Sequence, residues 1–132
     1  MERLEPSRVW IAGWAQAWPG RDPNLVASLY AEEAEFRTHP FRDPYRGPDG
    51  ARDYARRAFQ DEDDVRCWFG EPRITEGGAV VEYWASLLEE GREATIVGAS
   101  LLRFAPDGRV SSQRDYWHIA DGRREPYEGW GR

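Results

Sequence analysis

The spacing of apolar residues changes about halfway along the chain. In the first half they recur every three or four positions, which is typical of helices that each bury one face. The three predicted faces are Trp10, Gly13, Trp14, Ala17 and Trp18, then Leu25, Val26, Leu29 and Tyr30, then Ala51, Tyr54, Ala55, Ala58 and Phe59. The pattern therefore predicts three amphipathic helices before residue 61.

Local signals suggest where these helices begin and end. The Pro-Gly pair at 19–20 would stop the first helix, and Asp22 would cap the second, which we expect to fade near Glu33. A brief strand is predicted over residues 36–39. Because acidic groups are unfavourable at a helix C-terminus, the third helix should end before the acidic run 61–64.

From Val65 onward the sequence has the features of strands. Apolar and polar residues alternate, and β-branched and aromatic residues become common. Glycine-containing turn signals divide this region into predicted strands over 65–74, 79–88, 94–104 and 109–119. Four strands joined by tight turns form an antiparallel meander, and amphipathic helices need a sheet to cover. We predict an α+β fold in a single domain over 1–132, with a C-terminal tail from about residue 121.

Length and charge limit the functions open to the chain. Its 132 residues suffice for one ordinary domain. A net charge of -6 disfavours binding to nucleic acid, which depends on basic side chains that neutralise phosphates. All 18 basic residues are arginine, so Schiff-base chemistry on a lysine is excluded.

The sequence contains no recognisable metal, cofactor or membrane motif. Two histidines and the single Cys67 form no standard zinc pattern, and no glycine-rich phosphate loop is present. No apolar run is long enough to span a membrane. We therefore expect a cytoplasmic protein that uses no cofactor. Its 18 aromatic residues permit a ligand cavity without requiring one.

Three segments match short motifs of one superfamily in the same order and at similar spacing. Residues 29–36, LYAEEAEF, are similar to its F-A-x-D-A-x-F segment, and residues 46–50, RGPDG, to its x-G-x-x-G segment. Residues 113–117, QRDYW, are similar to the W-R-D-Y-F strand of the limonene epoxide hydrolase branch. Together the segments resemble the nuclear transport factor 2-like superfamily and, within it, the SnoaL-like proteins. The resemblance implies a cone-shaped α+β barrel, a pocket between the curved antiparallel sheet and the helices, and a homodimer through the outer sheet face.

The resemblance also implies that Asp115 is an acid or base, because related cyclases and epoxide hydrolases carry an acidic residue in the last strand. Strand alternation would then direct Gln113, Asp115 and Trp117 toward the pocket. Aromatic neighbours would raise the pKa of this carboxyl, which suits proton transfer near neutral pH. From the residues alone, the alternative is a surface carboxylate paired with an arginine.

Two positions, one in the short strand and one in the first helix, differ from the ketosteroid isomerase-like relatives. Thr38 occupies the place of their catalytic carboxylate, so that isomerase chemistry is not expected. The adjacent His39 is either a base or a loop histidine bonded to backbone. Trp14 occupies the place of their tyrosine, and its indole can donate a hydrogen bond but cannot exchange a proton. The alternative for Trp14 is a simple core aromatic.

Glu82 is the remaining carboxylate candidate. Its strand lacks the arginine and second aspartate of the epoxide hydrolase branch, so epoxide hydrolysis is not expected. If Glu82 faces inward, it places a second acid in the pocket and separates the two pKa values; if it faces outward, it is a cross-strand partner for arginine. Both orientations remain open.

We therefore expect a pocket for an apolar small molecule. If the protein is an enzyme, it is a cofactor-free isomerase, cyclase or hydrolase acting on an apolar, polycyclic or carbonyl-bearing substrate, with Asp115 as proton carrier assisted by His39 or Glu82. The candidate substrate-binding residues are Trp14, Phe36, Thr38, Tyr54, Trp84, Gln113 and Trp117. The alternative is a non-catalytic ligand-binding or protein-interaction domain. The tail, with Tyr127 and Trp130, would cross the sheet, contact a second subunit or be disordered.

Overall fold

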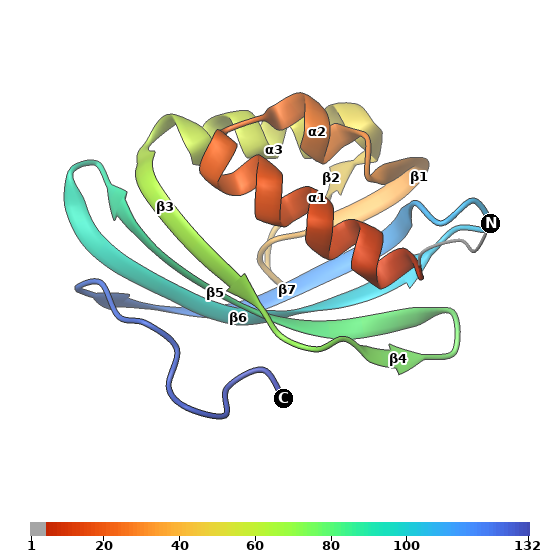
Figure 1. The fold of residues 1–132 in the computed structure, drawn as a ribbon. Helices are drawn as coiled ribbons and strands as arrows, with labels where there is room; N and C mark the ends of the chain where they lie inside the picture. Colours follow the sequence, from red (N-terminus) through yellow and green to blue (C-terminus); the bar gives the residue numbers. More distant parts are fainter. Residues whose placement is uncertain (1–4) are drawn as a thin grey trace.

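Helices cover one face of a curved seven-stranded sheet in the computed structural model, which describes residues 5–132 (Figure 1). The helices are α1 (Pro6–Gly20), α2 (Pro23–Ala27) and α3 (Gly47–Gln60). The strands are β1 (Tyr30–Arg37), β2 (Tyr45–Arg46), β3 (Glu62–Phe69), β4 (Arg73–Thr75), β5 (Gly78–Glu89), β6 (Arg92–Phe104) and β7 (Val110–Asp121). This arrangement confirms the predicted α+β architecture.

The second helix is shorter than predicted, and the strand after it is longer. The Asp22 side chain accepts a hydrogen bond from the backbone N–H of Leu25 at 3.1 Å and caps α2 as expected. However, α2 ends at Ala27 rather than near Glu33, and β1 begins at Tyr30. The reason is tertiary, because β1 pairs with β7 and Tyr30 lies opposite Val110 in that pairing. None of the helices within residues 5–132 is both long and apolar enough to cross a membrane.

The sheet is mixed rather than wholly antiparallel. Its strand order is β2-β1-β7-β6-β5-β3, with β4 paired to β5 off this path. The β5–β6–β7 meander is antiparallel as predicted, whereas β1 runs parallel to β7. The strand predicted over 65–74 begins earlier, at Glu62, and is divided into β3 and β4 by residues 70–72.

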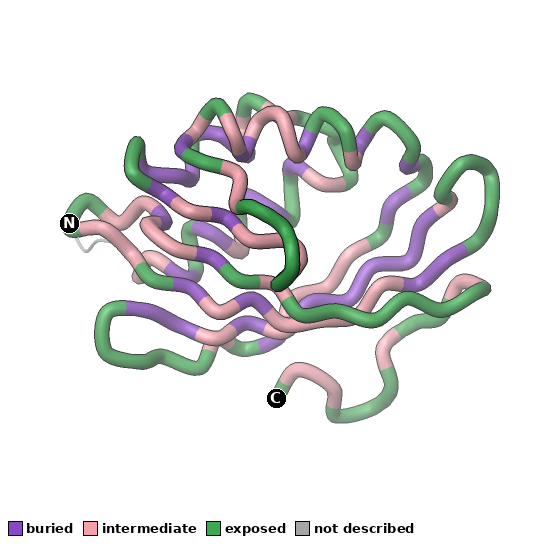
Figure 2. Tube along the Cα trace, turned by 180° about the vertical axis from the view of Figure 1, so that it is seen from behind, coloured by how far each residue is buried: buried purple, intermediate pink, exposed green. Residues whose placement is uncertain are grey.

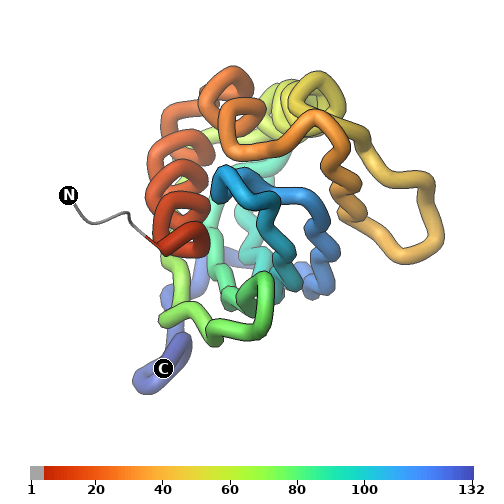
Figure 3. The backbone as a smooth tube through the Cα atoms, turned by 90° about the vertical axis from the view of Figure 1, so that its right-hand side faces the viewer, coloured from red at the N-terminus to blue at the C-terminus, as the bar shows by residue number. Residues whose placement is uncertain are grey.

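The core lies between the helices and the concave face of the sheet. Figure 2 shows buried positions concentrated on the central strands and on the helix faces turned toward them, and Figure 3 shows the two layers from the side. Trp10 and Ala17 of α1 and Phe59 of α3 are buried against Val81 and Leu102 of the sheet. Cys67 is half-buried and free, and burial raises the pKa of its thiol to about 11.

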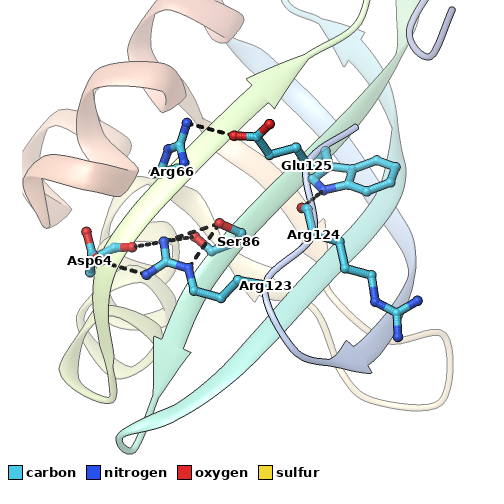
Figure 4. Close-up of polar contacts among 7 residues, drawn as sticks. Asp64, Arg66, Ser86, Arg123, Arg124 and Glu125 are labelled. Carbon is cyan, nitrogen blue, oxygen red and sulfur yellow. Dashed lines mark hydrogen bonds and ion pairs between the residues drawn. The ribbon is translucent and has the colours of Figure 1, made fainter. Parts of the chain in front are cut away.

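Residues 122–132 cross the outer face of the sheet, and Arg123 anchors this tail (Figure 4). The Arg123 guanidinium donates to the Asp64 carboxylate at 2.7 Å and to the Asp64 carbonyl at 2.5 Å. It also donates to the hydroxyl and carbonyl oxygens of Ser86, both at 3.2 Å. Asp64 has a left-handed φ of 49°, so the anchor is made at an irregular point of β3.

The rest of the tail packs on Trp84. The Trp84 indole N–H donates to the Arg124 carbonyl at 2.8 Å, and its ring lies edge-on to Tyr127 at 5.9 Å and to Trp130 at 5.7 Å. Of the alternatives for the tail, the structure therefore has it crossing the sheet of its own chain.

Arg123→Ala should destabilise the protein by about 1–3 kcal/mol, because the Asp64 and Ser86 acceptors lose a charged donor. Arg124→Ala is the matched control, since the Arg124 guanidinium makes one long contact, 3.4 Å to the Asp121 carbonyl. Urea unfolding followed by tryptophan fluorescence measures both. Equal stabilities of the two variants would contradict the anchoring role of Arg123.

Candidate functional site

A cavity of about 280 Å³ lies between the helices and the concave face of the sheet. One wall is formed by three tryptophans of α1, Trp10, Trp14 and Trp18. They are four residues apart and therefore share one helix face. Tyr54 and Phe59 of α3 and Tyr83 of β5 line other parts of it. The cavity therefore combines aromatic walls with polar groups, as small-molecule sites commonly do.

Asp115 of β7 lines this cavity with one oxygen held by protein and the other free. Its Oδ1 accepts hydrogen bonds from the Ser100 hydroxyl at 2.6 Å and from the Gln113 amide at 2.9 Å. Ser100 lies directly opposite Asp115 in the β6–β7 pairing. Among the described residues, Oδ2 has no hydrogen-bond donor, yet it is not among the fully buried unpartnered atoms. Oδ2 is thus accessible from the cavity.

Two tryptophans and a tyrosine determine how the Gln113 amide is oriented. Its Oε1 accepts from the Trp10 indole at 3.1 Å and from the Tyr30 hydroxyl at 2.5 Å. The Tyr30 hydroxyl in turn accepts from the Trp14 indole at 3.1 Å. Because an indole N–H can only donate, the amide oxygen must face Trp10, which directs the amide N–H groups toward Asp115.

Burial raises the pKa of Asp115 to about 6, and the hydrogen bonds from Ser100 and Gln113 offset only part of this shift. Desolvation disfavours the charged carboxylate, whereas donors aimed at Oδ1 favour it. A carboxyl that titrates close to neutral pH can accept a proton from a ligand and return it.

Two phenol groups near Asp115 are available to a ligand. The hydroxyls of Tyr54 and Tyr83 make no hydrogen bond to any of the described residues, and neither is a fully buried unpartnered atom. Burial, followed by the nearby charge of Asp115, raises the pKa of both phenols above its usual value. Both groups therefore stay protonated and can donate hydrogen bonds into the cavity.

Glu62 is a second carboxyl in the cavity, and the sequence analysis did not identify it. It is the first residue of β3, is 7% exposed, and accepts a hydrogen bond from the Trp18 indole at 2.7 Å. Burial raises the pKa of Glu62 to about 7. No sequence signal identifies Glu62, because strand alternation counted back from Val65 would turn Asp63 inward, whereas an irregularity of β3 between Asp63 and Arg66 shifts the pattern.

Five other candidates from the sequence analysis line the cavity together with Asp115: Trp14, Thr38, Tyr54, Gln113 and Trp117. Trp117 donates its indole N–H to the Thr38 carbonyl at 2.9 Å, which ties β7 to the end of β1. The predicted alternation along β7 therefore matches the observed placement of its three inward residues.

Four other candidates lie away from the cavity. His39 accepts a hydrogen bond from the backbone N–H of Phe41 at 3.2 Å, as expected of a loop histidine. Glu82 lies on the opposite face of β5 from Tyr83, and Trp84 shares that outer face and packs under the tail. Phe36 is buried in the core and stacks on Tyr30 at 5.5 Å.

No group of three or more histidine, cysteine, aspartate or glutamate side chains within residues 5–132 is placed to hold a metal ion.

Comparison with known proteins identifies the domain family and the fold. The sequence model of the SnoaL-like domain matches residues 11–113. No protein of curated function matches the chain significantly. Similar solved structures include a hypothetical protein from Catenulispora acidiphila with a ketosteroid isomerase-like fold, in complex with trimethylamine. It has a TM-score of 0.71 and 20% identity, with 80% of this chain and 82% of that chain covered.

Two other similar structures are enzymes. An epoxide hydrolase of M. tuberculosis has a TM-score of 0.69 and 16% identity, covering 86% of this chain and 83% of its own. The epoxide hydrolase/cyclase-like enzyme SalBIII, described in pyran ring formation in salinomycin, has a TM-score of 0.75 and 15% identity, covering 88% and 95%. At these identities the likeness establishes the shared fold.

The two raised carboxyl pKa values predict how stability depends on pH. Between their ordinary values near 4 and the folded values of about 6 and 7, the folded state binds more protons than the unfolded state. The contribution of these two carboxyls to the free energy of unfolding is therefore largest below about pH 4 and decreases as the pH rises through about 7. Glu62→Gln keeps an acceptor for Trp18 but cannot ionise.

Glu62→Gln should remove about 2–3 kcal/mol of this decrease between about pH 5 and about pH 8, measured by urea unfolding. Glu82→Gln, on the outer face, should keep the decrease unchanged. An unaltered pH dependence in Glu62→Gln would show that Glu62 titrates normally.

Proposed function

Because the chain belongs to the SnoaL-like domain family, we propose that its cavity binds an apolar small molecule and that Asp115 performs cofactor-free acid–base chemistry on it. The observation that supports this proposal is that the two oxygens of the Asp115 carboxylate have different surroundings. Oδ1 is held by Ser100 and Gln113, while Oδ2 is accessible from the cavity. A fixed carboxylate with one free oxygen meets the geometric requirement for a general base.

In the proposed reaction, Asp115 takes a proton from a ligand atom through Oδ2 and returns it at another position. Negative charge that develops on a ligand oxygen would be stabilised by hydrogen bonds from Tyr54 and Tyr83, whose phenols border the cavity. This sequence of steps fits isomerisation or cyclisation of a carbonyl-bearing substrate. His39 and Glu82 take no part, since both lie away from the cavity.

The base activity can be tested without knowing the substrate, using 5-nitrobenzisoxazole, which opens to a coloured phenolate when a carboxylate removes its ring proton. The rate should rise with pH through about 6, because the ionised form of Asp115 is the base. Asp115→Asn should lower the rate by about 100-fold or more.

Glu82→Gln is the control and should react like the unaltered protein. Full activity in Asp115→Asn would refute the assignment. A ligand-binding protein without catalysis would bind the probe with no acceleration of ring opening in any variant.

We also propose that two copies associate through the outer sheet face, at the part that the tail leaves open. Val97, Ala99 and Leu101 of β6 point outward there, beside Tyr116 of β7, which is 49% exposed. Adjacent apolar groups on an open sheet face favour a symmetric contact between identical chains. We propose the cytoplasm as the place of action, where the free thiol of Cys67 would stay reduced.

Sedimentation at roughly tens of micromolar should give a dimer, and Tyr116→Glu should give a monomer because it buries a charge in the contact. Tyr127→Glu changes another exposed tyrosine, which lies on the tail, and this control should remain dimeric. A monomeric unaltered protein would contradict the proposal.

A further inference from the structure

The cavity has a second acidic end that the chemistry at Asp115 does not use. Glu62, Asp61 and Glu89 all line it there. The two ends are separated along α1, because Trp10 bonds to Gln113 next to Asp115 whereas Trp18 bonds to Glu62. Trp10 and Trp18 are eight residues apart in α1, a rise of about 12 Å. Glu62 therefore marks a distinct part of the ligand space.

The Glu62 carboxylate lacks a positive partner. No ion pair formed by the described residues includes it, and the chain contains no lysine. Arg21 lies close enough to lower the pKa of Glu62, but its guanidinium pairs with Asp63 at 2.8 Å. Arg57, which lines the same cavity, pairs with Asp53 at 3.3 Å. One indole N–H compensates a buried carboxylate only in part.

Aromatic rings surround this uncompensated group. The Trp18 ring lies edge-on to Trp14 at 6.2 Å and to Tyr83 at 6.2 Å, and all three line the cavity. Ring faces attract organic cations, most strongly where water is excluded. The acidic side chains here are not grouped in a way that could hold a metal ion, within the part of the chain that is described.

We propose that the Glu62 end of the cavity is a subsite for an organic cation, a protonated or quaternary amine that pairs with Glu62 and lies against Trp18. The proposal rests on the proposed function only in taking the cavity as the ligand site. It defines the substrate class more narrowly, as an apolar molecule with an ammonium group at one end and the reacting atoms at the other.

The test compares choline with 3,3-dimethylbutan-1-ol, which has the same shape and no charge. Binding is followed by NMR through the indole N–H signals of the tryptophans, at about pH 8, where Glu62 is ionised beside Asp61 and Glu89. Choline should bind on the order of tenfold more tightly than the alcohol and should shift the Trp18 signal most.

Glu62→Gln should abolish this preference, and Glu82→Gln, which removes a carboxylate from the outer face, should preserve it. Asp115→Asn should also preserve it, because the cation subsite is separate from the proposed base. Should Glu62→Gln fail to fold, the comparison of the two probes in the unaltered protein decides by itself.

Equal binding of the two probes would overturn the cation subsite while leaving the chemistry at Asp115 in place. A choline preference that survives in Glu62→Gln would overturn the role of Glu62. If neither probe shifts the Trp18 signal, the subsite is also refuted. A further outcome separates the two proposals. If Asp115→Asn loses 5-nitrobenzisoxazole activity while the unaltered protein shows no preference for choline, the acid–base function of Asp115 is supported and the cation subsite is refuted.

Discussion

The pairing register of β5, β6 and β7 decides which side chains reach the cavity. Asp115 lies opposite Ser100, and Ser100 lies opposite Val81, so these three positions point to the same face. A slip by one residue in any of these strands would turn its whole inward set toward the outer face. The hydrogen bond from Ser100 to Asp115 and the tail packed on Trp84 both depend on this register. The chemistry of the site therefore rests on a backbone arrangement that spans the whole meander.

Both cavity carboxyls combine a desolvated position with a tryptophan contact. Glu62 accepts an indole N–H directly, whereas Asp115 is linked to Trp10 through Gln113. Indole offers one donor and no acceptor, so it can orient a polar group without competing for a proton. The tryptophan face of α1 thus contributes both apolar surface and directed hydrogen bonds. Keeping two such carboxyls in one small domain lowers its stability near neutral pH, a common compromise at functional sites.

Local periodicity was enough to predict the helix faces and the meander, because each depends on residues close together in sequence. The extent of β1 was not predicted, since Tyr30 enters a strand only because it pairs with the distant Val110. Glu62 was missed for a similar reason: its burial depends on Trp18, which lies 44 positions away in sequence. The orientation of Glu82 stayed open because aromatic residues occupy both faces of β5, and the tail covers the outer one.

The amide of Gln113 is the point where the helix layer and the reactive carboxylate meet. If Trp10 were replaced by a residue without an N–H, only the Tyr30 hydroxyl would orient the amide, and because a hydroxyl can also accept, the amide could rotate and present its oxygen to Asp115. A lone pair would then face a carboxylate, and the pKa of that carboxyl would rise further. A substitution of Trp10 would therefore change the pKa of Asp115, which lies more than a hundred residues away in sequence. We expect positions 10 and 113 to change together in related chains.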